Sequence, residues 1–461
     1  MNARRLLVPL LVTIALFSAA CGGSSPGGTT SPTAASGGPA AVTGTEAAGP
    51  AAAPAGGDAI QMRMAWWGSQ DRHDRTIKVI ELFQKENPNV KITWEFSAFD
   101  DYWTKLTTQA AGGNLPCLIQ QDYAKIGEWV SRDLLLPLDD YIQNGTIDTK
   151  NVEKTYLDGG KLNDKVYAIS LGTNSQSLIY DPALFEKAGI PLPSNDWTWK
   201  EFDQVTTQLK DKLSIYGMSV GIEDWQVMKL WLKQHGKTFY NPEGTGLGYD
   251  DDKMYVEFFT MIKGLMDKGA MPNREFEVSR GAPPVEDDPL VKQQAAIGYM
   301  WSNQIVAVSS AANRPLKAGL FPKLDASSTQ TGHYLKPSQF FSITAKCDQP
   351  EVAAKLINMF TNSIPANEIL LAERGVPISS EVRKALEGKI KDAQKEAFAL
   401  VALVEKNPSP LDPPDPAGHS EVISKVYTPL MDQVLYGQLA PEEAAKQFRE
   451  GADAILAKNK K

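Results

Sequence analysis

Short apolar segments alternate with helical patterns over residues 62–132, and this order constrains the fold more than any other feature of the chain. The strand segments are residues 62–67, "VKITWEF" and "CLIQQ" (117–121), and the middle one alternates apolar and polar residues as a strand does. Apolar residues recur at helical spacing over 77–83 and 100–111. This strand–helix–strand–helix–strand order predicts a parallel sheet with helices on both faces.

Two adjacent tryptophans end the first predicted strand, and charged residues follow them. Trp66 and Trp67 precede Gly68, after which Asp71, Arg72 and His73 come in quick succession. We expect a short loop here, because ligands of such sheets bind beyond the carboxyl ends of the strands. Successive strand residues point to opposite faces, so one ring should pack inward while the other can face a ligand.

A second α/β unit follows. It opens with "VYAISLGTNSQSLIYDPALFEKAGI", which reads as strand, crossing, strand and helix, and it continues with a helix opened by Thr198. Residues 295–301, 316–322 and 338–345 are further predicted strands, and the C-terminal part is helical around a proline-rich loop at 407–416. A chain of 461 residues is too long for one core, so two domains or lobes are expected.

The N-terminus has the pattern of a secreted, tethered protein. Arg4 and Arg5 precede an apolar run and the letters "SAAC", which predicts a signal peptide over residues 1–20. Cys21 follows the cleavage site as in a bacterial lipoprotein, although an ordinary signal peptidase could also cut there. Residues 21–58 are rich in Gly, Ser, Pro, Thr and Ala, and such a linker spans roughly 30–36 Å as a flexible coil.

Charge and cysteine content narrow the function classes. A formal net charge of −8 argues against nucleic acid as a partner and against direct adhesion to anionic lipid. Besides Cys21, the only cysteines are Cys117 and Cys347. Thiols outside the cytosol tend to pair, so these two are candidates for a disulfide.

Eight pieces of sequence occur along the chain in one order and cover most of residues 60–380. They are "WWG" with "DRH", "FQKENPNVKI", "DYWTKLTTQAAGGNLP", "WVSRDLLLPLDDYI", "NSQSLIYDPALFEKAGI", "TWKEF", "AAIGYMW" and "ERGVP". Each is weak alone, whereas the ordered set is strong. It resembles the extracytoplasmic solute-binding proteins of ABC transporters, in the carbohydrate-binding group (family 1) that includes maltose-binding protein.

The resemblance implies an α/β, two-lobed periplasmic-binding-protein-like (type II) fold with a hinge and an interlobe ligand cleft. The implied bounds are 59–173 plus 338–376 for lobe 1, and 174–337 plus 377–461 for lobe 2. The implied function is that of a sugar receptor, with an oligosaccharide as ligand, which delivers substrate to the permease subunits of an ABC importer by hinge closure. Together with Cys21, it implies an extracytoplasmic monomer held at the outer face of the cell membrane by a lipid anchor.

The residues expected to contact ligand carry aromatic or polar groups near strand ends and hinge crossings. They are Trp66, Trp67, Asp71, Arg72, Asp122, Tyr123, Asn174, Trp225, Trp301 and Arg374. Aromatic faces suit the C–H faces of sugar rings, and charged groups form strong hydrogen bonds with hydroxyls. Core packing for the aromatic residues, a solvated salt bridge for Asp71 and Arg72, and a structural turn for Arg374 remain open alternatives. The aromatic residues near the cleft predict a neutral or weakly polar saccharide.

The resemblance also bears on the cysteines. Similar proteins usually carry an aspartate where Cys117 stands and a polar residue near Cys347. In that family the chain re-enters lobe 1 as an antiparallel strand beside the third strand, which here is 338–345. The start of one strand then lies beside the end of the other, which predicts a disulfide between Cys117 and Cys347. Two unpaired buried thiols are the alternative.

Two other function classes stay open, a receptor for another polar solute and a tethered carbohydrate-active enzyme. A glycosidase needs two carboxylates facing one bond, and adjacent acidic residues do not provide that. Such neighbours occur at Asp100–Asp101, Asp139–Asp140, Asp250–Asp252 and Glu286–Asp288. The histidines show no metal-ligand spacing; they are His73, His235, His333 and His419. We therefore expect no catalysis, no metal and no cofactor.

Overall fold

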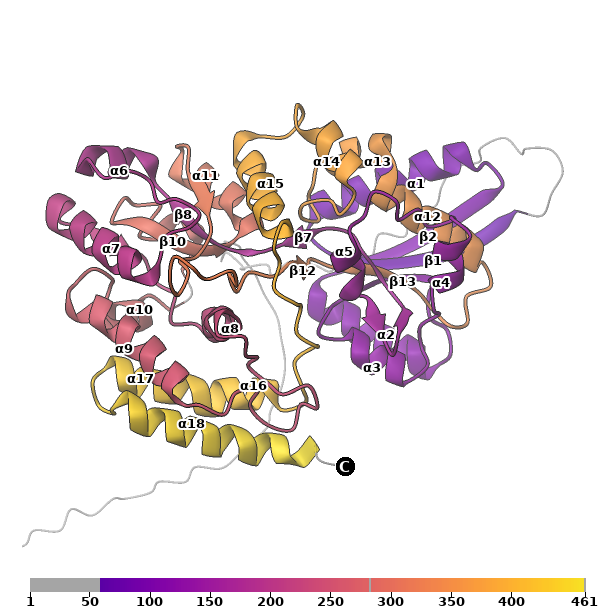
Figure 1. Cartoon of the computed structure of the whole chain (residues 1–461). Helices are drawn as coiled ribbons and strands as arrows, with labels where there is room; N and C mark the ends of the chain where they lie inside the picture. The colour runs from indigo at the N-terminus through magenta and orange to yellow at the C-terminus, as the bar shows by residue number, and fades with distance from the viewer. Residues whose placement is uncertain (1–58, 282, 460–461) are drawn as a thin grey trace, which may run out of the picture. The chain divides into compact units, whose positions relative to one another are not determined.

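The computed structural model describes residues 59–281 and 283–459, which form two lobes on separate β-sheets (Figure 1). The predicted signal peptide (1–20), Cys21 and the linker (21–58) lie outside the described residues. Within the described part of the chain, every helix is too short or too polar to span a membrane.

Lobe 1 is built on a five-stranded sheet with the order β2-β1-β3-β13-β6. Its strands are β1 (Ile60–Trp67), β2 (Val90–Ser97), β3 (Leu118–Gln121), β6 (Ile169–Ser170) and β13 (Phe340–Ile343). β1 pairs in parallel with β2 and β3, whereas β13 runs antiparallel to β3 and β6. The pairings confirm both the parallel arrangement predicted for the first three strands and the antiparallel re-entry beside the third.

Helices cover both faces of this sheet because its strands are apolar on both sides. Met62, Met64 and Trp66 pack in one buried cluster, while Ala65 and Trp67 pack in another. The helices are α1 (Gln70–Glu86), α2 (Phe99–Ala111), α3 (Ile126–Ser131), α4 (Asp139–Gln143), α5 (Lys154–Asp158), α12 (Pro350–Asn362), α13 (Ile364–Leu370) and α14 (Ser380–Leu386). A small hairpin joins β4 (Lys161–Leu162) to β5 (Lys165–Val166).

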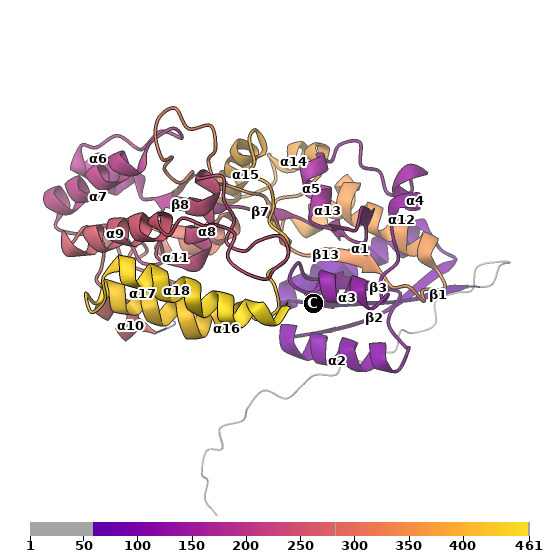
Figure 2. The ribbon, with the colours of Figure 1, turned by 60° about the horizontal axis from the view of Figure 1, so that its bottom comes forward.

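Lobe 2 has a four-stranded sheet with the order β11-β8-β10-β9. Its strands are β8 (Gln176–Tyr180), β9 (Tyr216–Met218), β10 (Ala295–Trp301) and β11 (Lys317–Gly319). Its helices are α6 (Pro182–Ala188), α7 (Trp199–Leu213), α8 (Trp225–Gln234), α9 (Lys253–Asp267), α10 (Arg274–Arg280), α11 (Ile305–Ala312), α15 (Asp392–Glu405), α16 (His419–Val422), α17 (Thr428–Leu435) and α18 (Pro441–Leu456). Thr198 caps α7 as predicted, and α17 and α18 pack beside α9 (Figure 2).

The chain crosses between the lobes at a short antiparallel ribbon of β7 (Thr173–Asn174) and β12 (Lys336–Pro337). Val376 forms a bridge to Thr173 and adds a third segment at the hinge. Farther along the chain, the proline-rich segment (residues 407–416) runs between the lobes from α15 to α16 (Figure 1). The lobe bounds stay predictions. They put α14 in lobe 2, but α14 packs on α13 and its Ser380 N donates to Asn151 O of lobe 1 at 2.9 Å, so we describe α14 with lobe 1.

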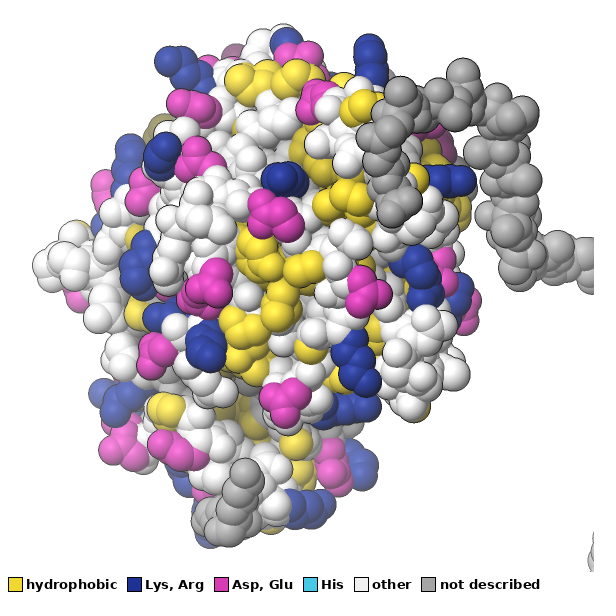
Figure 3. Space-filling model, turned by 90° about the vertical axis from the view of Figure 1, so that its right-hand side faces the viewer, with side chains coloured by type: hydrophobic (Ala, Val, Ile, Leu, Met, Phe, Trp, Pro, Cys, Tyr) yellow, Lys and Arg dark blue, Asp and Glu magenta, His cyan; other side chains and the backbone are white. Residues whose placement is uncertain are grey.

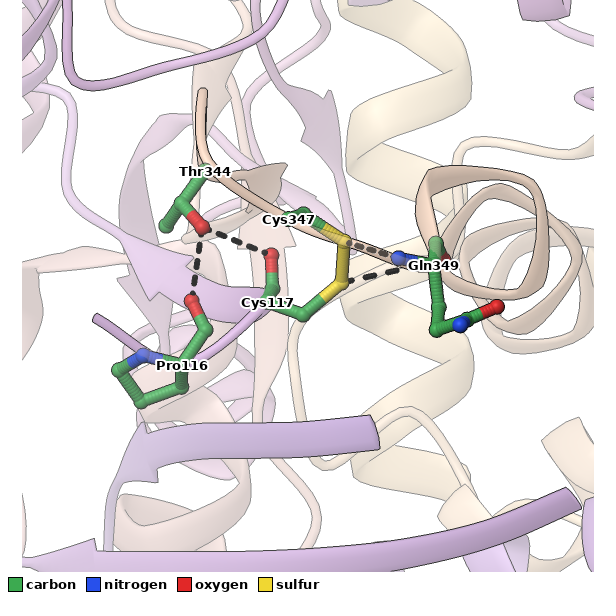
Figure 4. Close-up of a disulfide and its surroundings, with 5 residues drawn as sticks. All are labelled: Pro116, Cys117, Thr344, Cys347 and Gln349. Carbon is green, nitrogen blue, oxygen red and sulfur yellow. Dashed lines mark hydrogen bonds between the residues drawn. A yellow bond between two sulfur atoms is a disulfide. The ribbon is translucent and has the colours of Figure 1, made fainter. Parts of the chain in front are cut away.

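A disulfide joins the beginning of β3 to the turn after β13 (Figure 4). The Cα atoms of Cys117 and Cys347 are 4.5 Å apart, within the distance that a disulfide spans. The Thr344 hydroxyl donates to Pro116 O at 2.9 Å, and Gln349 N donates to Cys347 Sγ at 3.3 Å. The structure thus pairs the two cysteines that the sequence analysis expected to meet.

The residues after Trp67 form a helix rather than the loop that we predicted. α1 begins at Gln70, so Asp71, Arg72 and His73 lie in its first turn. A negative side chain in the first turn is favourable, because the helix dipole is positive at that end. The helix therefore begins before the apolar residues of helical spacing, and His73 and Thr76 occupy its buried face in the first turns.

The face of lobe 1 seen in Figure 3 carries charges of both signs. Lys and Arg side chains alternate with Asp and Glu across it, and apolar atoms lie between them. This face has no field of a single sign to attract a polyanion.

Candidate ligand-binding cleft

Both tryptophans at the end of β1 are core side chains. Trp66 has no exposed surface, and its Nε1 donates to Nδ1 of His73 at 3.0 Å. His73 in turn stacks on Phe96 with ring centroids 3.9 Å apart. Trp67 is only 9% exposed and packs on the opposite face of the sheet, with Tyr102 at 5.1 Å. The two rings face opposite sides of the sheet, as expected. Trp66 offers no surface to a ligand, so we do not propose it as a ligand-binding residue.

The charged residues after β1 are paired within lobe 1. Arg72 Nε lies 2.9 Å from a carboxylate oxygen of Glu373, and Arg75 Nε lies 2.8 Å from Asp71. Asp71 and Glu373 line a cavity of about 420 Å³ that also reaches Asn303 of lobe 2. Asp71 and Arg72 thus form ion pairs with other residues instead of the solvated salt bridge considered as an alternative, and the Arg72–Glu373 pair is mostly buried. Ligand binding by either residue stays a prediction.

Arg374 is a structural residue in this arrangement. It is 3% exposed, and its guanidinium donates to Gln120 Oε1 at 2.7 Å and to the Thr76 hydroxyl at 2.8 Å. Burial, with Arg72 nearby, lowers the pKa of Arg374 to about 9. Because these bonds hold its guanidinium inside lobe 1, we do not propose Arg374 as a ligand-binding residue.

A second group of sequence-predicted residues comes together around the proline-rich segment. Tyr123, just after β3, donates its hydroxyl to the backbone carbonyl of Asp412 and so links lobe 1 to this segment. The neighbouring Asp122 accepts from Ala124 N at 2.8 Å, which fixes one of its oxygens in the turn. Burial, assisted by the charges of Asp412 and Asp415, raises the pKa of Tyr123, so its hydroxyl stays protonated and can donate.

Helix α8 supplies the lobe 2 side with Trp225, Lys229 and Lys233, which are spaced four residues apart and share one helix face. Lys229 Nζ is 2.9 Å from Asp415 Oδ1, and Lys233 Nζ is 2.5 Å from Asp412 Oδ1. The Lys229 ammonium also lies 5.4 Å from the centroid of the Trp225 ring. These lysines hold the acidic residues of the proline-rich segment against lobe 2.

The proline-rich segment is bordered by cavities on both sides. One of about 640 Å³ lies against lobe 1 and is lined by Tyr123, Thr155 and Asn163, among others. Another of about 370 Å³ lies against lobe 2 and is lined by residues that include Lys233 and Gln330. Both volumes fall within the range of small-molecule sites, roughly 300–1,000 Å³.

Three of the residues predicted to contact ligand lie at the hinge together with two polar neighbours. We call the five the hinge cluster: Asp122, Asn174, Gln176, Trp301 and Lys336. Pairing register sets Lys336 opposite Asn174 and Trp301 opposite Gln176. The Lys336 ammonium lies 4.9 Å from the centroid of the Trp301 ring. Burial lowers the pKa of Lys336, and the charge of Asp122 is the largest influence that opposes this shift.

Several buried polar atoms near the hinge and on the proline-rich segment lack a hydrogen-bond partner among the described residues. They are Gln121 Nε2, Asn174 Oδ1, Gln176 Oε1 and Asp412 Oδ2. Buried polar groups in proteins are nearly always paired, so such atoms mark a place where a polar molecule can bind. They include both a donor and acceptors, which matches the dual character of hydroxyl groups.

The adjacent acidic residues lie on separate elements and do not form one site. Asp100 and Asp101 are in the first turn of α2, and Asp139 and Asp140 are in the first turn of α4. The described residues contain no group of three or more His, Cys, Asp or Glu side chains suited to a metal ion.

Comparisons with known proteins agree with this geometry. Residues 70–364 match the family described as bacterial extracellular solute-binding protein. The chain belongs to this family. An extracellular solute-binding protein of family 1 from Alicyclobacillus acidocaldarius has 28% identity and a TM-score of 0.76, covering 87% of this chain and 100% of its own. The fold class that the resemblance implied is thereby confirmed.

Two sugar-binding members of the family are also similar. A periplasmic oligogalacturonide-binding protein from Yersinia enterocolitica has 26% identity and a TM-score of 0.73, covering 87% of this chain and 100% of that one. The multiple sugar-binding protein of Streptococcus mutans is 24% identical over 174 residues, which is 36% of this chain and 38% of that protein. This last match therefore spans well under half of the Streptococcus protein.

Sequence reasoning missed most of the charged residues around the cleft. Lys229, Lys233, Lys336, Asp412 and Asp415 were not among the expected ligand residues. Two signals were present, the spacing of four residues that aligns Trp225 with the two lysines of α8, and the acidic pair within "LDPPDP". No local sequence pattern predicted that Lys336 lies at the hinge, because only the fold brings this residue next to Trp301.

Proposed function

We propose that this extracellular solute-binding protein is a saccharide receptor that delivers its ligand to an ABC importer. The observation that carries the proposal is the convergence of aromatic rings, charged groups and unpartnered polar atoms between the lobes. A saccharide offers C–H faces to aromatic rings and hydroxyls to both donors and acceptors. The two sugar-binding relatives support this ligand class.

Hinge closure is the mechanism we propose for delivery. A ligand that touches both lobes favours the closed form by its higher affinity for that form. The bond from Tyr123 to the proline-rich segment is a contact between lobe 1 and a segment fixed to lobe 2. We further propose that permease subunits recognise the closed form and that Cys21 carries a lipid that holds the receptor at the outer face of the membrane.

A thermal-shift screen of the purified protein against neutral and acidic oligosaccharides tests the ligand class. A ligand that binds only the folded state raises the unfolding temperature by mass action. Hits are then titrated calorimetrically, and the mixtures are analysed for shortened products. Saturable binding without products supports a receptor, turnover supports the enzyme alternative, and the absence of any shift across the panel contradicts the saccharide class.

The anchor is tested separately in cells. Stable membrane attachment requires more than one acyl chain, as bacterial lipoproteins carry. Cys21→Ala should therefore move the protein from the membrane fraction to the soluble fraction or the medium. Membrane association that persists in this variant would contradict the lipid anchor without affecting the ligand proposal.

A further inference from the structure

The charges around the cleft are balanced, which restricts the ligand. Lys229 pairs with Asp415, and Lys233 pairs with Asp412. Each of these lysines therefore already has a carboxylate partner within the protein. A ligand carboxylate would have to compete with Asp412 or Asp415 for either ammonium group.

Lys336 and Asp122 are the charged members of the hinge cluster, and neither has an ion-pair partner within 4.0 Å among the described residues. The Lys336 ammonium faces the Trp301 ring, and one oxygen of Asp122 is held by the backbone N–H of Ala124. Gln121 pairs with Phe340 in register, so Asp122 follows β3 beside the segment that leads from Lys336 into β13. The charge of Asp122 opposes the lowering of the Lys336 pKa by burial. The two side chains are thus opposite charges at the hinge that do not pair directly with each other.

A hydroxylated ligand suits this gap better than an anion does. Lys336 can only donate hydrogen bonds and ionised Asp122 can only accept them, while a hydroxyl does both. Neighbouring hydroxyls of one sugar would then make a charge-assisted bond at each end. A ligand carboxylate placed on Lys336 would instead be repelled by Asp122, since like charges at short range oppose each other.

The ring of Trp301 is already in contact with two neighbouring side chains. One face of its indole ring is covered by the Lys336 ammonium, and Tyr334 packs edge-on at a centroid distance of 6.2 Å. A sugar ring cannot stack on the face that the ammonium covers. An aromatic face holds an ammonium in place by cation–π attraction, which fixes its direction.

We propose that Lys336 and Asp122 bind adjacent hydroxyls of a neutral saccharide, and that Trp301 is a positioning residue that holds Lys336 for this contact. The inference rests on the proposed saccharide function. It adds the contacts that favour a neutral ligand, and it adds Lys336, a residue that the sequence did not single out. Asn174 and Gln176, which pair with Lys336 and Trp301 in register, supply acceptors for further hydroxyls of the same ligand.

The charge class is tested with matched saccharide pairs in isothermal titration calorimetry. Each pair consists of a neutral trisaccharide and its uronic acid counterpart, such as (1→4)-linked galactotriose with trigalacturonate and cellotriose with cellotriuronate. Neutral members should bind more tightly, and their affinity should change little with salt. Tighter binding of a uronate member overturns this inference while leaving the receptor function intact. If no saccharide of the larger screen binds, both proposals fail together.

The two contacts are tested with Lys336→Met and Asp122→Asn against the neutral saccharide that binds best. Each variant should weaken binding by roughly 10- to 100-fold, the usual effect of losing a hydrogen bond to a charged group. Lys355→Met removes an exposed lysine of α12 and is the matched control, which should bind as the wild-type protein does. Wild-type affinity in both cleft variants, with unchanged unfolding temperatures, contradicts the proposed contacts.

The role of Trp301 is tested with a double-mutant cycle. Trp301→Ala should weaken binding in the wild-type background but cost nothing more in the Lys336→Met background, because the tryptophan acts through the lysine. Trp301→Phe keeps an aromatic face and should restore most of the affinity lost in Trp301→Ala. Equal losses from Trp301→Ala in both backgrounds would show that Trp301 contacts the ligand itself.

Discussion

The end of β1 and the hinge cluster contain similar residue types, but they use them differently. At the end of β1, the indole N–H of Trp66 is bonded to His73 and the guanidinium of Arg72 is paired with Glu373. In the hinge cluster, Asn174 Oδ1 and Gln176 Oε1 lack partners among the described residues, and Lys336 has no ion pair there. The named groups at the end of β1 are paired within the protein, whereas the named groups of the hinge cluster have no protein partner in the described part of the chain.

Residue type alone therefore does not identify a binding site. Aromatic and charged residues beside each other can build a core as readily as a cleft. The distinguishing feature is whether the buried polar groups are already paired, since an unpaired one carries a cost that a ligand can remove. We therefore expect changes at the end of β1 and at the disulfide to alter stability, and changes in the hinge cluster to alter binding.

The largest stability effect is predicted for the disulfide of lobe 1. Cys117 and Cys347 close a loop of 230 positions, for which the chain-entropy model gives about 5 kcal/mol, although measured gains are often smaller. The double variant Cys117→Ser, Cys347→Ser should therefore unfold at lower urea concentration, while its ligand affinity should change little. Thiol labelling of the denatured, unreduced wild-type protein is the control, and labelling of either cysteine would contradict the pairing.

The next largest effect is predicted for Trp66→Ala. Its ring is fully buried in lobe 1, and truncating a buried tryptophan costs about 3–5 kcal/mol. Urea unfolding measures this loss, and calorimetric titration should find near wild-type affinity in the folded variant. A large loss of affinity with unchanged stability would contradict the core role of Trp66 and would show that it contributes to ligand binding.

A pH effect of intermediate size is predicted for the hinge. His333 is 1% exposed and its Nε2 accepts from Phe321 N at 2.9 Å; burial lowers its pKa from 6.5 to about 3. Because the folded-state value is the lower one, neutral His333 adds stability above pH 6.5, and this contribution is lost as the pH falls toward 3. The loss between pH 7 and pH 5 is about 2 kcal/mol.

The comparison protein for this measurement is His333→Gln, which has no titrating ring. The free energy of unfolding is determined for both proteins from pH 7 to pH 5. The wild-type protein should lose more stability than the variant on acidification. Parallel pH profiles would show that His333 does not carry the effect.

The main elements of the fold were predictable because their signals are local or periodic. The strand–helix order of residues 62–132 and the helix cap at Thr198 can be predicted from short stretches of sequence. The pairing of the two cysteines was predicted from the strand order of the family. The hinge cluster could not be predicted in the same way. Lys336 and Trp301 are 35 positions apart in the sequence, and only the pairing of β12 with β7 and of β10 with β8 brings them together.

The smallest effect is predicted for the contact that links lobe 1 to the proline-rich segment. Tyr123→Phe removes the hydrogen bond to the Asp412 carbonyl but keeps the ring, which packs against Phe340 with centroids 6.4 Å apart. A hydrogen bond of this kind contributes about 1 kcal/mol net. If the bond forms only on closure and the unliganded receptor is mostly open, the apparent dissociation constant should rise roughly fivefold.

Comparing the increase in the apparent dissociation constant of Tyr123→Phe across several ligands shows how Tyr123 acts. A bond that stabilises closure lowers the affinity for every ligand by the same factor, because the closing equilibrium is common to all of them. A hydroxyl that touches the ligand lowers affinity only for those saccharides with a group at that position. Titration of Tyr123→Phe with several saccharides from the screen separates the two roles, and small-angle scattering of the unliganded variant measures the opening directly. Equal losses together with a more open unliganded form support the link, whereas ligand-dependent losses would move Tyr123 into the binding site itself.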